Sequence, residues 1–265
     1  DIAPAQVLAG GGADVMVDWM PSALAAREKG LPLVNIAQPF KSSGMMLTCR
    51  KDMGVNSTAD LKGKTLGVWF YGNEYPFLSW MSRLGLKTDG SANGVTVLRQ
   101  GWGVEPLTEG QAACVSTMSY NEYWVVRDAG YSPEQLTVFK YQSEGAATLE
   151  DGLYVHEKNL SDAAFKDKMV RFVRASMKGW KYAEANPKEA AMIILDNDDA
   201  GVQTEKHQVR MMGEIAKLTA GSNGSLDPAD YERTVKVLMS GDSDPVITKK
   251  PSGAWTNEIT NAALN

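Results

Sequence analysis

TLGVWF, residues 65–70, is a nearly continuous apolar run, and YGNEYP, residues 71–76, follows it directly. A short apolar run without polar alternation is typical of a strand buried on both faces, as in a parallel sheet. Gly72 then marks a turn, and Pro76 suits the first turn of a helix that we expect over 76–84, before a stop at Gly85. The stretch therefore predicts a strand whose carboxyl end opens into a loop, which is where open α/β sheets bind ligands.

The same succession of strand and helix recurs on both sides of this stretch. Apolar runs predict the strands, and stretches with start and stop signals predict the helices between them. The predicted strands are 13–17, 33–37, 44–49, 65–70, 95–98, 112–117, 138–141 and 152–155, and the predicted helices are 2–10, one that starts at Pro21 and includes 23–29, 76–84, 105–109 and 121–128. This alternation predicts an α/β protein with mostly parallel sheets.

From Ser161 onward the pattern is helical almost to the end. An apolar stripe at helical spacing consists of Phe165, Met169, Phe172, Val173, Met177 and Trp180. Further helices are predicted after Asn186-Pro187, where Glu189 would complete a capping box, over 204–218, and from Asp227-Pro228 to Gly241. A sheet-rich first part and a helical last part predict two lobes, with the last helices returning to the first lobe.

The composition excludes several classes of protein. The chain has 265 residues, of which 43% are hydrophobic and 22% charged, as in ordinary globular proteins. The net charge of −5 argues against a nucleic-acid partner. Two cysteines and two histidines are too few for a Cys/His zinc site, so we expect no metal and no cofactor. No apolar run approaches the ~20 residues that a membrane span needs.

Three predicted strand ends carry an acidic side chain close to an aromatic one: Asp18-Trp19, residues 71–75 and residues 118–123. Aromatic faces stack on planar rings, and carboxylates accept hydrogen bonds from amino groups or ring N–H groups. Clusters of Arg or Lys, which phosphate, sulfonate or nitrate would require, are missing from these loops, and Lys41 is the nearest candidate. The pattern predicts a neutral or mildly cationic heteroaromatic ligand.

The predicted ligand-binding residues are Asp18, Trp19, Trp69, Tyr71, Gly72, Asn73, Glu74, Tyr120, Asn121, Glu122 and Glu150. Structural explanations compete with this assignment, because Asn73 also suits a helix N-cap that leaves Glu74 solvated. The triplet at residues 10–12 lacks the lysine of a phosphate loop and precedes a strand, so it is read as a helix stop and turn. His156 and His207 fit no catalytic motif, and no G-x-S-x-G elbow is present.

A set of segments carries a family resemblance. They are LKGKTLGV at 61–68 with the Asn-Glu-Tyr-Pro loop, Gly-x-Ala-Asp within 12–17, TLEDGLY at 148–154, Trp180, Asn186-Pro187, and Asp227-Pro228 followed by Tyr231. Together they resemble the NMT1/THI5-like family of periplasmic substrate-binding proteins, over nearly the whole chain. The resemblance implies a class II binding-protein fold, in which two α/β lobes joined by two hinge-crossing strands close over a ligand in the interlobe cleft.

The resemblance also implies a function. The ligand would pass to an ABC permease in the inner membrane, and an aminopyrimidine precursor of thiamine is the expected ligand. A riboflavin-like, sulfonate or nitrate ligand stays open, as does an enzyme such as a pyrimidine synthase or small hydrolase. Fungal synthases of the family carry a cysteine-rich motif that this chain lacks, so we expect a transport protein and not an enzyme. We expect a periplasmic or other extracytoplasmic monomer.

The resemblance further implies how the lobes divide. Residues 1–45 with 152–265 would form lobe one and residues 46–151 lobe two, with hinge strands at 44–50 and 150–155. Family members open with a strand-helix-strand unit that is missing ahead of Asp1, and no signal peptide is visible, so we read Asp1 as a processed, cloned or incomplete beginning. Cys49 and Cys114 would both lie in lobe two. They can pair only if their Cα atoms lie within ~7 Å, which the sequence leaves open.

Overall fold

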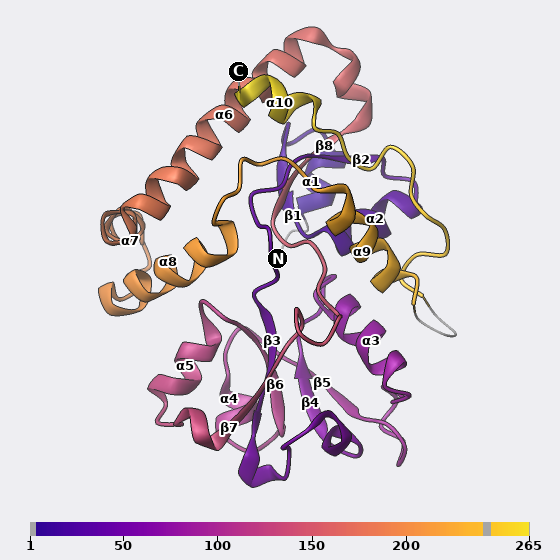
Figure 1. The fold of residues 1–265 in the computed structure, drawn as a ribbon, viewed down its shortest axis with the longest axis vertical. Coiled ribbons are helices and arrows are strands. Elements are labelled where there is room, and N and C mark those ends of the chain that lie inside the picture. The colour runs from indigo at the N-terminus through magenta and orange to yellow at the C-terminus, as the bar shows by residue number, and fades with distance from the viewer. Residues whose placement is uncertain (1–3, 241–244, 265) are drawn as a thin grey trace. The chain divides into compact units, whose positions relative to one another are not determined.

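A computed structural model describes residues 4–240 and 245–264 of the chain (Figure 1). The chain divides into two compact units. Unit 1 takes residues up to Ser43, then Thr148–Met239 and the chain from Val246 on, whereas unit 2 takes Gly44–Ala147 and a short piece that begins at Ser240. Each unit has its own β-sheet, so the predicted α/β class is confirmed.

Unit 1 contains a three-stranded sheet in the order β1-β8-β2. Its strands are β1 (Met16–Asp18), β2 (Leu33–Ala37) and β8 (Gly152–His156), and helix α2 (Met20–Glu28) connects β1 to β2. Both β1 and β2 pair with β8 in antiparallel fashion. The return strand therefore lies between the two strands that the sequence places first.

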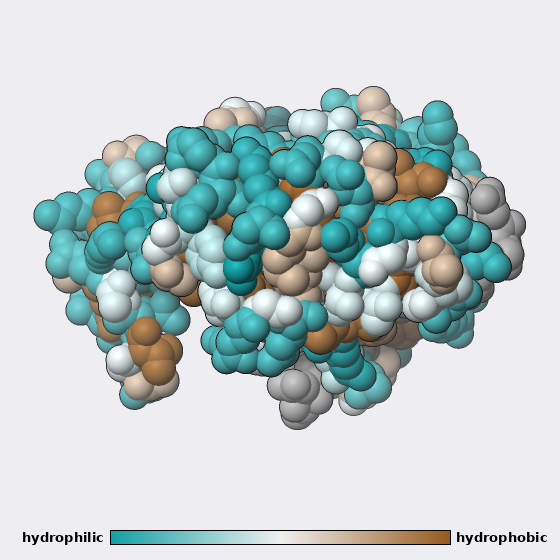
Figure 2. All heavy atoms as spheres, turned by 90° about the horizontal axis from the view of Figure 1, so that it is seen from below, coloured by the Kyte–Doolittle hydropathy of each residue, from teal (hydrophilic) through white to brown (hydrophobic). Residues whose placement is uncertain are grey.

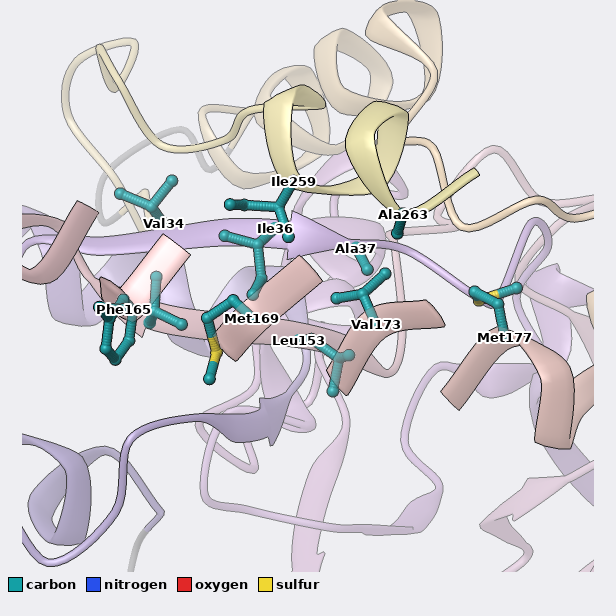
Figure 3. Close-up of a cluster of buried hydrophobic side chains, with 11 residues drawn as sticks. Val34, Ile36, Ala37, Leu153, Phe165, Met169, Val173, Met177, Ile259 and Ala263 are labelled. Atoms are coloured by element: carbon teal, nitrogen blue, oxygen red, sulfur yellow. The ribbon is translucent and has the colours of Figure 1, made fainter. Parts of the chain in front are cut away.

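The core of unit 1 lies between the sheet and two helices, α6 (Ala163–Ala185) and α10 (Glu258–Leu264). Figure 3 shows side chains of both helices pointing toward Ile36 and Ala37 of β2. Four members of the predicted stripe are buried in this cluster, namely Phe165, Met169, Val173 and Met177. Phe172 is 42% exposed, because the buried face of α6 is narrower than the predicted stripe. Trp180 packs its ring edge-on against Phe40.

The remaining helices of unit 1 are α1 (Pro4–Ala9), α7 (Pro187–Asp196), α8 (Glu205–Thr219) and α9 (Pro228–Leu238), with the 3-10 helix η4 at Glu157–Ser161. Asp227 caps α9 by accepting from the Ala229 N–H. The predicted capping box at Asn186 is wrong, because the Asn186 amide instead donates to the Tyr182 carbonyl of the preceding helix. The predicted first residues of the opening helix, 2 and 3, and the predicted stop at Gly241 lie outside the described residues.

Unit 2 contains a five-stranded sheet in the order β5-β4-β6-β3-β7. The strands are β3 (Met45–Arg50), β4 (Thr65–Val68), β5 (Thr96–Arg99), β6 (Cys114–Met118) and β7 (Leu136–Lys140), and the helices are α3 (Glu74–Arg83), α4 (Glu105–Thr108) and α5 (Glu122–Asp128). Short 3-10 helices lie at Lys51–Met53, Thr58–Leu61 and Pro133–Gln135. Strand β4 is parallel to β5 and β6, so the carboxyl ends of these three strands lie at one edge of the sheet.

The prediction of mostly parallel sheets is wrong, because the sheets are mixed. Strand β3 is antiparallel to β6 and β7, and β8 is antiparallel to β1 and β2. The strands joined by helices do run in one direction within each unit, as the alternation predicts. However, β3 lies between β6 and β7, and β8 lies between β1 and β2, which breaks the parallel pairing. Alternation along a sequence indicates strand direction and says nothing about which strands become neighbours.

Neither predicted hinge strand itself passes between the units. Strand β3 belongs wholly to unit 2 and β8 wholly to unit 1. The chain changes unit just ahead of each strand, between Ser43 and Gly44 and between Ala147 and Thr148.

Cys49 and Cys114 form a disulfide in unit 2. They are register partners on β3 and β6, with Cα atoms 3.9 Å apart, and both side chains are fully buried. The sequence leaves open whether the two cysteines pair, and the pairing of β3 with β6 brings them together.

The face of the protein drawn in Figure 2 is predominantly polar. On this face hydrophobic residues are scattered among the hydrophilic ones. Among the described helices, none is both long enough and apolar enough to cross a membrane.

Candidate functional site

The β4–α3 loop of unit 2 is held by hydrogen bonds to its own backbone and to its neighbour. The Trp69 indole donates to the Gly101 carbonyl (2.9 Å), and the Asn73 amide donates to the Phe70 carbonyl (3.0 Å). The Glu74 carboxylate accepts from the Gly72 N–H (2.7 Å). Asn73 has helical backbone angles and makes no capping hydrogen bond, so the alternative of an Asn73 cap is wrong. These bonds fix the shape of the loop.

Tyr71 is held in an unusual backbone conformation within this loop. It is the one non-glycine residue of the described chain with a positive φ, of 67°, and Gly72 follows at 102°. Its side chain is 74% exposed. A left-handed conformation at a non-glycine residue costs on the order of 1–3 kcal/mol, so the surrounding structure must impose it. Such strain is commonly found where a loop positions a side chain for function.

The β6–α5 loop lies at the same edge of the sheet and has its own anchored carboxylate. Glu122 accepts from the Met118 N–H (2.9 Å) and from the Asn121 side-chain amide (2.7 Å). Burial raises the pKa of Glu122 above its ordinary value, although these hydrogen bonds act in the opposite direction. Tyr120 is half-buried beside them. Glu122 thus stabilises this loop. Each of its carboxylate oxygens accepts one hydrogen bond there and can accept another from a ligand.

The β5–α4 loop is a part of this edge that the sequence reasoning missed. Gln100 holds it in place by donating to the Ser116 carbonyl (2.9 Å) and accepting from the Ser116 N–H (2.8 Å). Trp102 follows and is 88% exposed. Arg99, the register partner of Val68, lies over the rings of Phe70 and Tyr71, with its guanidinium carbon 5.3 and 5.0 Å from their centroids.

The prediction that Lys41 is the nearest cation to these loops is therefore wrong, because Arg99 contacts Phe70 and Tyr71. Arg99 follows the predicted strand 95–98 directly, so the strand-end rule would have found both it and Trp102. The rule failed there because it required an acidic side chain beside the aromatic one. Lys41, the cation named in its place, lies in unit 1 and donates to the Ser225 carbonyl. Burial lowers the pKa of Lys41.

In unit 1, two carboxylates lie close together at the end of β1. Asp18 accepts from the Trp19 N–H (2.8 Å), and burial raises the pKa of Asp18 to about 6, with the nearby Asp151 raising it further. Burial also raises the pKa of Asp151, against the effect of a hydrogen bond from the Trp19 side chain. The Tyr154 hydroxyl is buried beside both acids. Two acids in a half-buried setting favour a ligand that brings hydrogen-bond donors or positive charge.

Glu150, the remaining predicted residue, is buried, at 2% exposure. The Ser43 hydroxyl donates to its carboxylate (2.5 Å), and the Gln38 amide donates to its backbone carbonyl. Through these contacts Glu150 helps to hold strand β8, which begins two residues later.

The structure therefore divides the predicted residues into two sets. Asp18, Trp19 and Glu150 belong to unit 1, and the eight others, Trp69, Tyr71, Gly72, Asn73, Glu74, Tyr120, Asn121 and Glu122, lie on neighbouring loops at one sheet edge of unit 2. The unit 1 set offers carboxylates, whereas the unit 2 edge combines anchored carboxylates, aromatic rings and one arginine. Both sets suit a planar, polar small molecule.

Comparison with known proteins gives consistent results. The sequence profile described as NMT1/THI5 like matches residues 1–190. A formylaminopyrimidine-binding protein of Halalkalibacterium halodurans is 24% identical over 266 aligned residues, which cover 96% of this chain and 78% of that protein. Among solved structures, a periplasmic sulfonate-binding protein of Methylobacillus flagellatus has a TM-score of 0.69 at 13% identity, covering 98% of this chain and 77% of that one.

One structure of similar fold is an enzyme. The desulfurization enzyme DSZB has a TM-score of 0.64 at 15% identity, covering 94% of this chain and 84% of that one. At such identities the structural similarity shows the fold alone. The fold is that of two-lobed periplasmic binding proteins, and it also serves in catalysis.

Proposed function

Because this chain belongs to the NMT1/THI5-like family, we propose that it is the solute-binding receptor of an ABC importer and that its ligand is an aminopyrimidine. The similarity to a formylaminopyrimidine-binding protein supports this ligand class. The observation that carries the proposal is the pair of half-buried carboxylates, Asp18 and Asp151, beside the Trp19 indole.

The chemistry of the carboxylate pair matches that of the ligand. An aminopyrimidine has an exocyclic amino group that donates hydrogen bonds and a flat ring that stacks on aromatic side chains. Both acids have raised pKa values because burial penalises their charge, so a donor that replaces the lost hydration is bound favourably. Trp19 contacts both carboxylates, since its backbone N–H donates a hydrogen bond to Asp18 and its indole donates one to Asp151.

The ligand-contacting residues are proposed separately for each unit. In unit 1 Asp18, Trp19 and Asp151 would contact the ligand, with Glu150 in a supporting position. In unit 2 the contacts would come from Trp69, Tyr71 and Tyr120, with Gly72, Asn73, Glu74, Asn121 and Glu122 shaping the loops. Ligand binding that favours a closed state would supply the signal that a permease recognises.

Location and partners follow from this assignment. A binding receptor of an importer works outside the cytoplasm, as a monomer that docks to a membrane permease. The buried disulfide supports an oxidising compartment, since structural disulfides persist there. The proposed role is transport and not catalysis.

The test is a calorimetric titration of the purified protein with a formylaminopyrimidine, alongside riboflavin, nitrate and an aliphatic sulfonate. We expect saturable binding of the pyrimidine with the strongest affinity of the four, and recovery of the pyrimidine chemically unchanged after incubation. Absence of pyrimidine binding would reject the ligand class. Conversion of the pyrimidine to a product would reject the receptor in favour of an enzyme.

A further inference from the structure

Among the described residues, the Arg99 guanidinium lacks the carboxylate or carbonyl partners that Arg27, Arg50 and Arg83 have. Arg27 and Arg50 each pair with a carboxylate, and Arg83 donates to two backbone carbonyls. Within residues 4–240 and 245–264, no carboxylate or carbonyl pairs with Arg99, and its contacts are the ring faces of Phe70 and Tyr71. Stacking occupies the face of the guanidinium and leaves the N–H groups along its edge available.

The surrounding loops hold this arrangement in place. Tyr71 adopts its left-handed backbone between two fixed points, the Asn73–Phe70 and Glu74–Gly72 hydrogen bonds. Arg99 ends a strand that is paired with β4, so its backbone is fixed as well. The stacking of Arg99 on Tyr71 therefore depends on backbone positions that the sheet edge and its loop hold in place.

Trp102 adds an exposed aromatic surface three residues after Arg99. Its loop is fixed by Gln100 and by the hydrogen bond from the Trp69 indole to Gly101. A tryptophan that is 88% exposed on a fixed loop leaves apolar surface in water, and that surface is buried only when a ligand or partner covers it.

From these contacts we infer that Arg99, Phe70, Tyr71 and Trp102 bind an anionic oxygen group, a phosphate ester or a sulfonate, carried on a planar ring. A guanidinium presents paired N–H donors that match two oxygens of such a group, and the aromatic side chains accept the ring. This inference rests on the proposed function and makes it narrower, because it assigns an anionic substituent to the pyrimidine.

The test compares a neutral 5-hydroxymethyl aminopyrimidine with its phosphate ester by calorimetry on the whole chain. The wild-type protein should bind the ester at least about tenfold more tightly, and Arg99→Gln should remove that preference, since charge-assisted hydrogen bonds are lost. Arg99→Lys, which keeps the charge without the planar fork, should give an intermediate preference. Lys62→Gln, an equal change of charge at an exposed turn of the same unit, is the control and should leave the preference intact. Melting temperatures will show whether each variant is folded.

Equal affinity of the wild-type protein for alcohol and ester would overturn the inference while leaving the proposed function standing. So would an ester preference that survives in folded Arg99→Gln. If the wild-type protein binds neither pyrimidine, the proposed function fails, and phenyl phosphate and benzenesulfonate then decide the inference alone. Binding of either that depends on Arg99 supports the inference and identifies the anion, and binding of neither contradicts it.

Discussion

Asp18 and Gly152 are register partners across β1 and β8 of unit 1. A Cβ atom at position 152 would lie 2.4 Å from Asn35 Nδ2 and 2.7 Å from Gln38 Oε1. These buried amides bond to each other, and Gln38 also bonds to the Glu150 carbonyl. Glycine at 152 therefore lets a buried amide pair approach the backbone that carries Asp151, the partner of Asp18 in the proposed site.

Replacing Gly152 by alanine should disrupt this approach. We expect Gly152→Ala to lower the free energy of unfolding by about 1–3 kcal/mol, because the amides must move away from an overpacked position. Thermal melting followed by circular dichroism measures the loss. Gly179→Ala is the matched control, since nothing lies within 4 Å of a Cβ there, and in helix α6 it should raise stability by up to ~1 kcal/mol. Equal melting temperatures for Gly152→Ala and wild type would refute the steric argument.

The ionised, partly buried Asp18 side chain should lower the free energy of unfolding at neutral pH. Its pKa is raised from 3.8 to about 6 in the folded protein, so the folded state binds more protons than the unfolded state between these values. Stability should therefore fall as pH rises through this window and stay lower above it. Asp18→Asn should stabilise the protein at pH 7.5 by on the order of 1–2 kcal/mol, less than the full shift implies because the side chain keeps contact with solvent.

At pH 4 Asp18→Asn should have the same melting temperature as wild type, because Asp18 is protonated in the folded wild-type protein. Melting curves of both proteins at pH 4, 6 and 7.5 measure the difference. A stabilisation that is equal at all three values would mean that charge burial is not its cause. Asp18→Asn should also weaken pyrimidine binding, a trade of stability against function.

The Cys49–Cys114 disulfide closes a loop between residues 65 positions apart, so its removal should destabilise the protein. We expect the double variant Cys49→Ala/Cys114→Ala to lose about 2–4 kcal/mol of unfolding free energy in urea titrations. Reductant should lower the stability of the wild-type protein under denaturing conditions and leave the double variant unchanged. Two thiols that react in the denatured, unreduced wild-type protein would contradict the bond.

Tyr141 has a buried hydroxyl with no hydrogen-bond partner in the described part of the chain. Its ring packs against Trp80, with centroids 5.2 Å apart. Tyr141→Phe keeps the ring and removes the unpaired group, whose burial costs about 1–3 kcal/mol. The variant should be as stable as wild type or more stable in urea titrations. A clear loss of stability would show that the hydroxyl has a partner.

Much of the fold was predictable because it depends on local pattern. Residues 33–37 form β2 with the predicted bounds, and the start of α9 follows from Asp227 and Pro228. Neighbour relationships were not predictable, since the insertion of β3 between β6 and β7 depends on contacts distant in sequence. The Cys49–Cys114 pairing was undecided for the same reason.

The sequence was enough to locate the strand-end loops of unit 2, but it did not predict the contacts that their side chains make. The sequence predicts Glu74 and Glu122 as ligand-binding residues, and in the structure both accept hydrogen bonds from their own loops. Asp151 and Arg99 are absent from the predicted set of ligand-binding residues, although each lies next to a predicted strand. Asp151 acquires its character from the register of β1 with β8, and Arg99 from its stacking on Tyr71.

The central claim, that Asp18 and Asp151 read the amino group of a pyrimidine, is tested most directly by calorimetry with two ligands. One is a formylaminopyrimidine, and the other is the same molecule with hydrogen in place of the exocyclic amino group. At pH 7.5 the wild-type protein should prefer the amino compound by about tenfold or more, since an unpaired buried group costs ~1–3 kcal/mol, and Asp151→Asn should reduce that preference. Equal affinity of the wild-type protein for the two compounds would contradict the account.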